Sequence, residues 1–567
     1  MLEKPFKILW YSLPCLIDTS NGAAISNKYI LESLRARGVG VMVLNATIAD
    51  DDSGMKEFNS MVAELPDNDQ GFYRFSLNGL EYVVVKTGSS RLNEIVAKEQ
   101  TLVWSIFVKI IEDFKPDLVM GFCPDLFSLS LRREAKARGI STVYAVCNAS
   151  HDNFSFPDCD AVVTNSVAAC SYYNRRNDRH VKVQPFGIVI NQDKVLPPDA
   201  PRDPRYITMV NPTPYKGIAL FIGLIRAFRK KYPHSDQRFL IVRSRGDYEN
   251  TVRSLHYKDG TSFLSTPEAN DILSHVDLAE HTSNIRAVYQ ITRVMVCPSL
   301  CYEAWGMVAT EAIMSGIPVL GTRFGGLPEA MGARVSTGED GSWNIDESTI
   351  GGIVLDIPRN TYDDNLCVPS DEEIAPYLEA LENLMTQDWS ERVRAAAAVN
   401  APERNLQRLI DIIVPLMERS RQTRTPYTNS FFLSDSYMKE KRDRENGVST
   451  QPQQPAHDGA PAAAAAAAAA PSAAAAAAPS AAAAAGDNSC ALGQADAAAA
   501  AAGASVETSG TVVTGAKQEN DNTVSTTAAA PAAGAAKGSG TRNSKAGNKS
   551  TGKGSRHGQR KSTARKS

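Results

Sequence analysis

Cysteines and long apolar runs are both scarce in this chain, and each shortage excludes a class of protein. The 567 residues include nine cysteines, none in the CxxC spacing of metal sites, which argues against a disulfide scaffold or a structural zinc site. No apolar run approaches the roughly 20 residues that cross a bilayer. The opening segment FKILWYSLP is too short, and too soon followed by Asp18 and Asn21, for a signal peptide. We therefore expect a soluble, cytoplasmic protein of a reducing compartment, without a transmembrane segment.

Aromatic residues almost disappear from about Asn446 onward, where alanine runs broken by Pro471 and Pro479 give way to a Ser/Thr/Gly/Lys-rich end. Such a composition cannot bury enough apolar surface to offset the chain entropy lost on folding. Alanine favours helix, but the prolines interrupt the runs. We therefore predict that residues 446–567 form a disordered, low-complexity tail and that the folded mass lies within about residues 1–435.

Charge divides the chain in the same way. Residues 446–567 hold 11 Lys+Arg against 6 Asp+Glu, so the tail carries +5 and the preceding body −8. From Lys537 to the end there are ten basic residues and no acidic one. A basic, flexible end suits weak contact with a polyanion or a membrane surface, although the lack of aromatic residues argues against stacking on nucleic-acid bases. A solvated tail without a specific partner explains the composition equally well.

Alternating strand and helix patterns recur through the body and predict an α/β protein. Short intervals between strand, helix and strand mean parallel sheets with crossover helices. A cluster of prolines between 197 and 204 marks a boundary, so we predict domains over 1–197 and 198–400, then a helical segment over 401–435. The expected strands lie at 7–12, 39–44, 118–121, 142–146 and 161–164, and then at 206–210, 239–242, 294–297 and 317–320.

The segment from Val294 to Gly332 carries the most chemistry. It predicts an apolar strand, a loop with Glu303, a helix that Gly306 opens and that carries Glu311, and a second strand followed by a glycine turn. The first amides of a helix lack internal acceptors and favour an anion. Carboxylates suit sugar or ribose hydroxyls, whereas bare amides suit phosphate. Together these groups fit a molecule that has both, such as a nucleotide-sugar.

This string resembles the donor site of the retaining family-4 (group 1) glycosyltransferases of the GT-B fold. The family's E-x7-E signature falls on Glu303 and Glu311, with its aromatic–glycine pair on Trp305 and Gly306. The resemblance implies two doubly wound Rossmann-like domains facing a cleft, the first on the acceptor side and the second binding the nucleotide-sugar. It also implies a UDP- or GDP-linked donor, no required metal or other cofactor, and a last helix, here Glu403 to Arg421, that crosses back to the first domain.

The same resemblance assigns roles to individual residues. Glu303 would bind the sugar hydroxyls beside the reacting carbon, and Glu311 would bind the ribose. The donor diphosphate would lie against Lys216 and against the amides of Gly306, Met307 and Val308.

One position departs from the family pattern. Relatives usually carry an arginine five residues before the lysine, and both contact the diphosphate, but this chain has Asn211 there. The departure puts full neutralisation of the diphosphate in question. Arg243, Arg245 and Arg323 each lie just past an expected strand end and are candidates to replace the missing charge.

Two residues of the first domain complete the expected site. Gly22 lies between a strand and a helix, where relatives have a glycine-rich loop opposite the donor phosphate, and glycine lets backbone approach a ligand closely. His151 is the nearest match to a histidine that many relatives carry beside the reacting carbon. An ordinary loop glycine and an exposed loop histidine are the alternatives at these two positions.

Functions from three classes fit the sequence. A retaining glycosyltransferase, which moves a sugar from a nucleotide-sugar to an acceptor hydroxyl, explains the whole string from Val294 to Gly332. Another GT-B enzyme, a sugar-nucleotide epimerase or a phosphorylase, would share the fold, although a phosphorylase would bring a cofactor-lysine motif that the chain does not show. A non-catalytic binding or scaffold protein that acts through its basic tail is the third, and the departure at Asn211 keeps it open.

Overall fold

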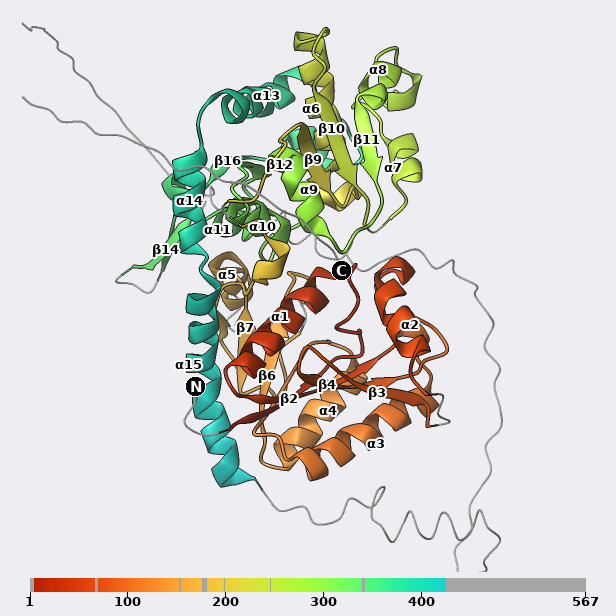
Figure 1. Cartoon of the computed structure of the whole chain (residues 1–567), viewed down its shortest axis with the longest axis vertical. Helices are drawn as coiled ribbons and strands as arrows, with labels where there is room; N and C mark the ends of the chain where they lie inside the picture. Colours follow the sequence, from red (N-terminus) through yellow and green to blue (C-terminus); the bar gives the residue numbers. More distant parts are fainter. Residues whose placement is uncertain are drawn as a thin grey trace, which may run out of the picture. The chain divides into compact units, whose positions relative to one another are not determined.

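Two large sheets, each flanked by helices, form the part of the protein that the structure describes (Figure 1). The structure is a computed structural model, and it describes residues 5–424 apart from 67–69, 152–153, 176–180, 198, 245 and 339–341. The tail predicted over 446–567, with its basic end, lies outside the described residues.

The first sheet has eight strands in the order β3-β4-β2-β1-β5-β6-β7-β8, and all neighbours are parallel except β3 and β4. Its strands are β1 (Lys7–Tyr11), β2 (Gly40–Ala46), β3 (Phe72–Leu77), β4 (Leu80–Val85), β5 (Leu118–Gly121), β6 (Ser141–Val146), β7 (Ala161–Thr164) and β8 (Val183–Pro185). The helices between them are α1 (Gly22–Ala36), α2 (Lys56–Ala63), α3 (Ala97–Phe114), α4 (Leu126–Ala137) and α5 (Val167–Asn174).

Strand β1 shows why helices cover both faces of this sheet. Successive side chains of a strand point to opposite faces, so a strand that is apolar at every position must be buried on both. Ile8 and Trp10 lie in one core with Ile30 of α1, whereas Leu9 and Tyr11 lie in a second core with helix α3. The continuous apolar pattern of β1 therefore requires the doubly wound arrangement.

The second sheet has six strands, all parallel, in the order β11-β10-β9-β12-β13-β16. Its strands are β9 (Tyr206–Val210), β10 (Arg238–Val242), β11 (Val276–Ala279), β12 (Thr292–Cys297), β13 (Val319–Thr322) and β16 (Gly352–Leu355). Its helices are α6 (Ile218–Lys231), α7 (Tyr248–Ser254), α8 (Ala269–Ser274), α9 (Ile285–Ile291), α10 (Met307–Met314), α11 (Leu327–Ala330), α12 (Arg359–Asp363), α13 (Asp371–Thr386) and α14 (Ser390–Val399). A separate antiparallel hairpin joins β14 (Arg334–Thr337) to β15 (Trp343–Asp346).

The predicted fold class is confirmed, because both large sheets are mainly parallel and wound with helices in the GT-B manner. The strands expected at 118–121, 161–164 and 206–210 are β5, β7 and β9 without any shift of their ends. Two antiparallel pairs, β3–β4 and β14–β15, have no counterpart among the expected strands. Strands β3, β14 and β15 contain no buried side chain, so burial on a parallel sheet did not shape their sequences. Strand β4 is different: it is buried at five of its six positions, and its apolar run was missed, as were the short parallel strands β8, β11 and β16.

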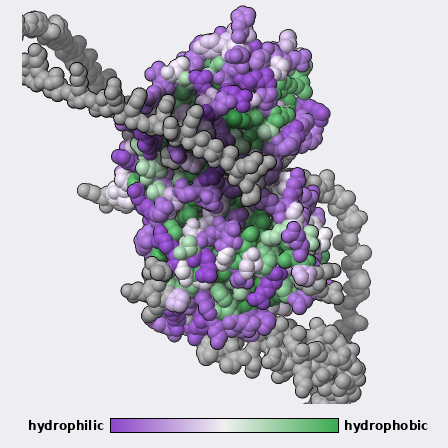
Figure 2. Space-filling model, viewed as in Figure 1, coloured by the Kyte–Doolittle hydropathy of each residue, from purple (hydrophilic) through white to green (hydrophobic). Residues whose placement is uncertain are grey.

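Hydrophilic residues cover most of the described surface in the view of Figure 2, and hydrophobic residues form smaller groups between them. Within the described residues, no helix combines the length and the apolar character that crossing a bilayer requires.

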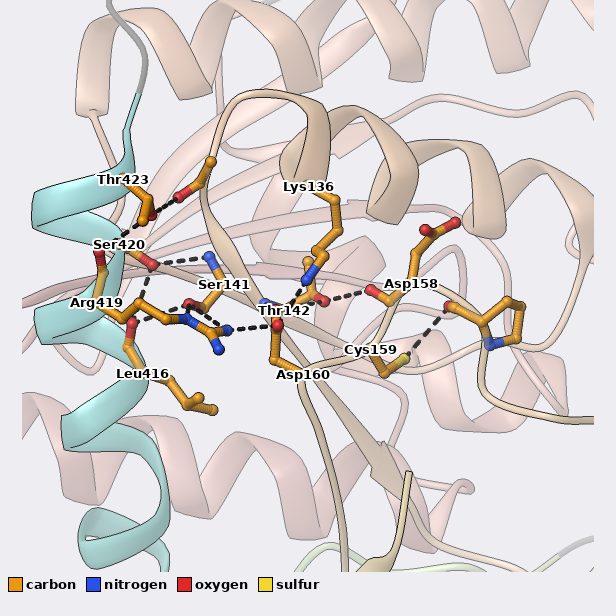
Figure 3. A network of polar contacts seen from close by, with 12 residues as sticks. Lys136, Ser141, Thr142, Asp158, Cys159, Asp160, Leu416, Arg419, Ser420 and Thr423 are labelled. Atoms are coloured by element: carbon orange, nitrogen blue, oxygen red, sulfur yellow. Dashed lines mark hydrogen bonds and ion pairs between the residues drawn. The ribbon is translucent and has the colours of Figure 1, made fainter. Parts of the chain in front are cut away.

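The last helix, α15 (Pro402–Thr423), packs against the first sheet, although the second sheet precedes it in the chain. Leu409 and Ile413 are buried in the same core as Trp10. Hydrogen bonds then fix the C-terminal part of the helix to the start of β6: the Ser141 amide donates to Ser420 Oγ at 2.7 Å, and Ser141 Oγ donates to the Leu416 carbonyl at 2.9 Å (Figure 3). The helix thus returns the chain to the domain in which it began.

Two buried aspartates of the first domain take charged partners from α15 and the residue after it. Asp160, whose side chain is 7% exposed, pairs with Arg419 (Figure 3). Asp117, whose side chain is 6% exposed, pairs with Arg421 at 3.0 Å and with Arg424 at 3.2 Å. A carboxylate removed from water is costly unless donors surround it. The end of α15 is therefore part of the first domain's polar interior.

A truncation tests this role of α15. Ending the chain after Glu418 removes the three arginines that pair with Asp117 and Asp160, so we expect the free energy of unfolding to fall by about 1–3 kcal/mol for Asp117 and by less for Asp160, which keeps its ion pair with Lys136 at 2.6 Å. Urea unfolding followed by circular dichroism measures the change. A chain ended after Glu445 is the matched control and should unfold at the wild-type midpoint; equal midpoints for both truncations would contradict the assignment.

Candidate functional site

Lys216 and Glu303 meet at the carboxyl edge of the second sheet. Strands β9 and β12 are parallel neighbours, so the segments that follow them start at the same edge. The Tyr215 carbonyl accepts hydrogen bonds from the Leu300 amide at 2.8 Å and the Cys301 amide at 3.1 Å, which ties the two segments together. Lys216 Nζ then donates to Glu303 Oε1 across 87 residues of sequence.

Glu303 has a second donor within its own loop. Ser299 Oγ donates to Glu303 Oε1 at 2.6 Å, so a hydroxyl and an ammonium group converge on one carboxylate oxygen. The Glu303 side chain is 14% exposed and that of Lys216 is 27% exposed. Both charges are thus partly shielded from water, paired with each other, and still accessible to a ligand.

Two glycines let the backbone segments of the site approach this closely. Gly217 follows Lys216 with φ 83°, and a Cβ there would lie 1.9 Å from the Pro298 carbonyl oxygen. Gly325 has φ 64°, and a Cβ there would lie 2.3 Å from the Glu303 carbonyl oxygen. Only glycine avoids both the left-handed backbone strain and the clash. The glycine turn expected at 325–326 therefore packs directly against the loop that carries Glu303.

Helix α10 starts at the end of the Glu303 loop, as expected. Gly306 is its N-cap with φ 111°, and Met307 and Val308 form the first turn, whose amides lack intrahelical acceptors. Trp305 is 6% exposed, and its indole nitrogen donates to Thr310 Oγ1 at 2.7 Å. The aromatic residue of the motif thus anchors the loop to the helix.

Glu311 is buried on the same helix. Its side chain accepts a hydrogen bond at 2.6 Å from the hydroxyl of Tyr289, a residue of α9. Burial raises the pKa of Glu311 to about 7, although the Tyr289 hydrogen bond and the charge of Lys194 act in the opposite direction. The two glutamates of the motif therefore differ in environment: Glu303 faces a cation, and Glu311 lies in the protein interior beside a phenol.

The position that departs from the family pattern, Asn211, has a left-handed backbone with φ 64°, and no donor among the described residues forms a hydrogen bond with its buried side-chain oxygen. The candidate replacement arginines are already paired. Arg243 contacts Glu249, and Arg323 donates to Glu347 at 2.9 Å. Arg245 lies outside the described residues.

His151 and Gly22 lie in the first domain. His151 is 4% exposed, its ring contacts Phe154 and Phe156, and its Nε2 forms a hydrogen bond of 2.8 Å with the Tyr144 hydroxyl. The histidine is thus buried within an aromatic cluster, not an exposed loop residue, and its catalytic role stays a prediction. Gly22 is the first residue of α1, and nothing lies within 4 Å of where its Cβ would be.

Glu329 is a residue of this region to which the motif assigns no role. It belongs to α11, is 4% exposed, and accepts hydrogen bonds of 2.8 Å from the amides of Val167 and Ala168 at the start of α5 in the first domain. Tyr302 adds a hydrogen bond of 2.9 Å from its hydroxyl to the Ala168 carbonyl. Burial raises the pKa of Glu329 to about 7, against the effect of the two amides. The only sequence signal was its place at the end of the string GGLPE.

Replacing Glu329 tests this link between the two domains. Glu329→Ala leaves two buried amides of α5 without their acceptor, so we expect the free energy of unfolding to fall by about 1–3 kcal/mol per amide. The midpoint of urea unfolding at pH 8 measures the effect. Glu372→Ala, an exposed glutamate in the first turn of α13, is the control and should leave the midpoint unchanged. Equal urea midpoints for Glu329→Ala and Glu372→Ala would contradict the prediction, because they would mean that water can replace the Glu329 carboxylate as acceptor for the two amides of α5.

Within the described residues, no group of three or more His, Cys, Asp or Glu side chains is placed to hold a metal ion.

Comparison with known families matches the segment that holds these residues. Residues 197–343 match the family model described as Glycosyl transferases group 1. This range includes Lys216, Glu303 and Glu311 together with the start of α10. The second domain is therefore similar to group 1 glycosyltransferases over residues 197–343.

Two curated proteins are similar to part of the chain, and both are subunits of a phosphatidylinositol N-acetylglucosaminyltransferase. The gpi3 subunit from Schizosaccharomyces pombe is 25% identical over 222 residues, which cover 36% of this chain and 45% of that protein. The human protein is 28% identical over 216 residues, which cover 35% of this chain and 41% of that protein. The chain thus spans less than half the length of the curated relatives it matches.

Among solved structures, a glycosyltransferase from Rickettsia africae aligns with 73% of this chain and 99% of its own, at 15% identity and a TM-score of 0.49. WaaG, a glycosyltransferase involved in lipopolysaccharide biosynthesis, aligns with 72% of this chain and 99% of its own, at 14% identity and a TM-score of 0.46.

Proposed function

We propose that this protein is a retaining glycosyltransferase that moves a sugar from a nucleotide-sugar to an acceptor hydroxyl. The observation that carries the proposal is the contact of Lys216 with Glu303 beside the start of α10, within the segment that matches the group 1 family model. This contact places a cation for phosphate, a carboxylate for hydroxyls and free helix amides at one edge of one sheet.

In this proposal the donor changes the partners of Lys216 and Glu303. Without a ligand, the two charges compensate each other. A bound diphosphate attracts the Lys216 ammonium more strongly than one carboxylate does, because it carries more charge. Glu303 is then available to the sugar hydroxyls, with the hydroxyl of Ser299 still bonded to it. The pair therefore avoids an uncompensated charge before the donor binds.

The proposed chemistry depends on stabilising the leaving group. The acceptor hydroxyl would attack the sugar on the face from which the diphosphate departs, so that the configuration of the reacting carbon is retained. Lys216 and the amides of Gly306, Met307 and Val308 would stabilise the charge that develops on the diphosphate. Glu311 would hold the ribose. Asn211 would contribute its side-chain amide where relatives place an arginine, and Gly22 would let the first domain approach the phosphate.

The names of the curated relatives suggest which donors and acceptors to examine first. Both are named for N-acetylglucosamine transfer to phosphatidylinositol and as subunits of a transferase. We propose a UDP- or GDP-linked donor, without a required metal, and a cytoplasmic site of action. UDP-N-acetylglucosamine with phosphatidylinositol in detergent micelles is therefore the first pair of a panel that also contains other UDP- and GDP-sugars.

A turnover assay with this panel separates the candidate functions. A glycosyltransferase releases nucleoside diphosphate and forms a glycosylated acceptor, whereas an epimerase changes the sugar without releasing diphosphate. A phosphorylase consumes or forms a sugar phosphate, and a non-catalytic binding protein produces none of these changes. Release of nucleoside diphosphate that depends on the acceptor would support the proposal; its absence across the panel, also in the presence of partner proteins, would reject it.

Replacing each of the two motif glutamates should impair a different property, turnover for Glu303 and nucleotide binding for Glu311. Glu303→Gln keeps the size of the side chain but removes its charge beside the reacting sugar, so we expect turnover to fall by about 100-fold with an unchanged unfolding midpoint. Glu311→Ala removes a charge-assisted hydrogen bond and should weaken nucleotide binding by about 1.5–3 kcal/mol. Steady-state kinetics and calorimetry measure the two effects. Wild-type turnover in both variants would show that the donor lies elsewhere.

Lys216 should contribute to the binding of a nucleoside diphosphate and not to the binding of the nucleoside alone. Lys216→Ala removes a charge that faces the diphosphate, so the affinity for UDP or GDP should fall by about tenfold or more, while that for uridine or guanosine stays within about twofold. Calorimetry with each diphosphate and its nucleoside measures the difference. Lys230→Ala, which changes an exposed lysine of α6, is the control. Equal losses for diphosphate and nucleoside would contradict the assignment.

The tail should be dispensable for the chemical step. A chain ended after Glu445 keeps every residue of the proposed site and the whole of α15, so its kcat on a soluble acceptor should equal that of the full chain. Sedimentation with anionic vesicles at low and high salt tests whether the basic end adds a screened attraction to polyanions. A truncated protein that unfolds at the wild-type midpoint but has lost turnover would show that the tail takes part in catalysis.

A further inference from the structure

One oxygen of the Glu311 carboxylate accepts a hydrogen bond, and the other accepts none from the described residues. Tyr289 donates to Glu311 Oε2 at 2.6 Å, and within the described residues this is the one hydrogen bond of the carboxylate. The Glu311 residue as a whole is 7% exposed. A buried carboxylate can accept several hydrogen bonds, so a single donor leaves Oε1 with unused capacity.

Packing holds the Tyr289 hydroxyl in place. Tyr289 lies in α9, is completely buried, and belongs to the same core as Trp305, Ala309 and Ile313. These neighbours are the motif aromatic and two residues of α10, the helix that carries Glu311. A ring that is fixed by close packing presents its hydroxyl in one direction, which is what orienting a ligand-binding group requires.

Other titratable groups face Glu311 from two further elements. Lys194, in the short helix Gln192–Lys194, lowers the pKa of Glu311 by its charge, and Tyr29 of α1 has its own pKa raised chiefly by burial and then by the Glu311 charge. Burial is the larger influence on Glu311 and raises its pKa to about 7. The Tyr289 hydroxyl is the group that opposes this most directly, because it stabilises the ionised form by donating to it.

We infer that Tyr289 is a positioning residue of the donor site, whose hydroxyl orients the Glu311 carboxylate so that Oε1 accepts hydrogen bonds from the ribose hydroxyls of the nucleotide. The inference rests on the proposed function, which supplies the ribose. It adds that ribose recognition is the work of a pair of residues on two helices, α9 and α10, and not of the motif glutamate alone.

A comparison of nucleotides with and without ribose hydroxyls tests the inference. Calorimetry is performed at pH 7 with UDP and GDP and with their 2′,3′-dideoxy forms, on the wild type, Tyr289→Phe, Glu311→Gln and the double variant. We expect the wild type to prefer the ribonucleotide by about tenfold or more, and each single variant to lose most of that preference. The double variant should resemble Glu311→Gln, because Tyr289 acts only through Glu311.

The matched control is Tyr377→Phe. Tyr377 is also a buried tyrosine of the second domain, but its hydroxyl donates to the backbone carbonyls of Leu355 and Asp356. Its replacement should leave the ribose preference unchanged. The control separates loss of the Tyr289–Glu311 contact from the general effect of deleting a buried hydroxyl.

A pH series provides a readout that a purely structural role would not change. Without the Tyr289 donor, Glu311 should keep its proton to a higher pH, so the ribose preference of Tyr289→Phe should recover in part as the pH rises from 7 to 9. The part that does not recover reports the orientation that the hydroxyl supplies. The wild type should already have most of its preference at pH 7.5 to 8. Glu311→Gln has no group to titrate here and should show no recovery.

The outcomes distinguish failure of this inference from failure of the proposed function. Unfolding of the same four proteins in urea, without ligand, gives a double-mutant cycle that should show coupling between Tyr289 and Glu311. No coupling, or a Tyr289→Phe protein that keeps the full ribose preference, would overturn the inference while the proposed function stands. A wild type that binds neither diphosphate would overturn both, and the cycle would then show that the contact serves stability alone.

Discussion

Carboxylates that are withdrawn from water must find hydrogen-bond donors, and the way this chain meets that requirement joins segments that are distant in sequence. Asp117 and Asp160 of the first domain pair with arginines at the end of α15, after the chain has passed through the whole second domain, and Asp160 also pairs with Lys136 of α4. Glu329 of the second domain accepts two amides at the start of α5 in the first. Glu311 takes its donor from the neighbouring helix α9. The same electrostatic cost therefore shapes the domain contacts and the proposed site.

The proposed donor site holds two opposite charges that stabilise each other. Lys216 and Glu303 would each be costly as an isolated, partly buried charge, but together they compensate each other and stay accessible. Their meeting depends on two parallel neighbours, β9 and β12, and on glycines that let the following segments touch. A ligand with a diphosphate and hydroxyls offers both residues new partners at the same time, which is a physical reason to associate this pair with a nucleotide-sugar.

Much of this arrangement could be predicted from local patterns. The continuous apolar run of β1 requires a sheet buried on both faces, and the string from Val294 to Gly332 predicted the loop of Glu303 and the helix of Glu311 in their observed order. Strands β14 and β15 were missed because they contain no buried side chain, whereas β4 was missed although it is apolar and buried at five of six positions. His151, for which an exposed loop position was the alternative, is buried among aromatic rings, because Phe154 and Phe156 follow it and fold around it.

The sequence by itself determined the α/β class, the recurring strand–helix pattern and the residue types of the candidate site, because hydrophobic periodicity, glycine turns and motif spacing are properties of short segments. Only the tertiary structure decided which of those residues meet. The contact of Lys216 with Glu303 spans 87 residues, and that of Tyr289 with Glu311 spans 22. Glu329 showed no periodicity that could indicate its two amide partners in the first domain. Such contacts depend on how sheets, helices and domains pack, and that packing is set by interactions that no single segment contains.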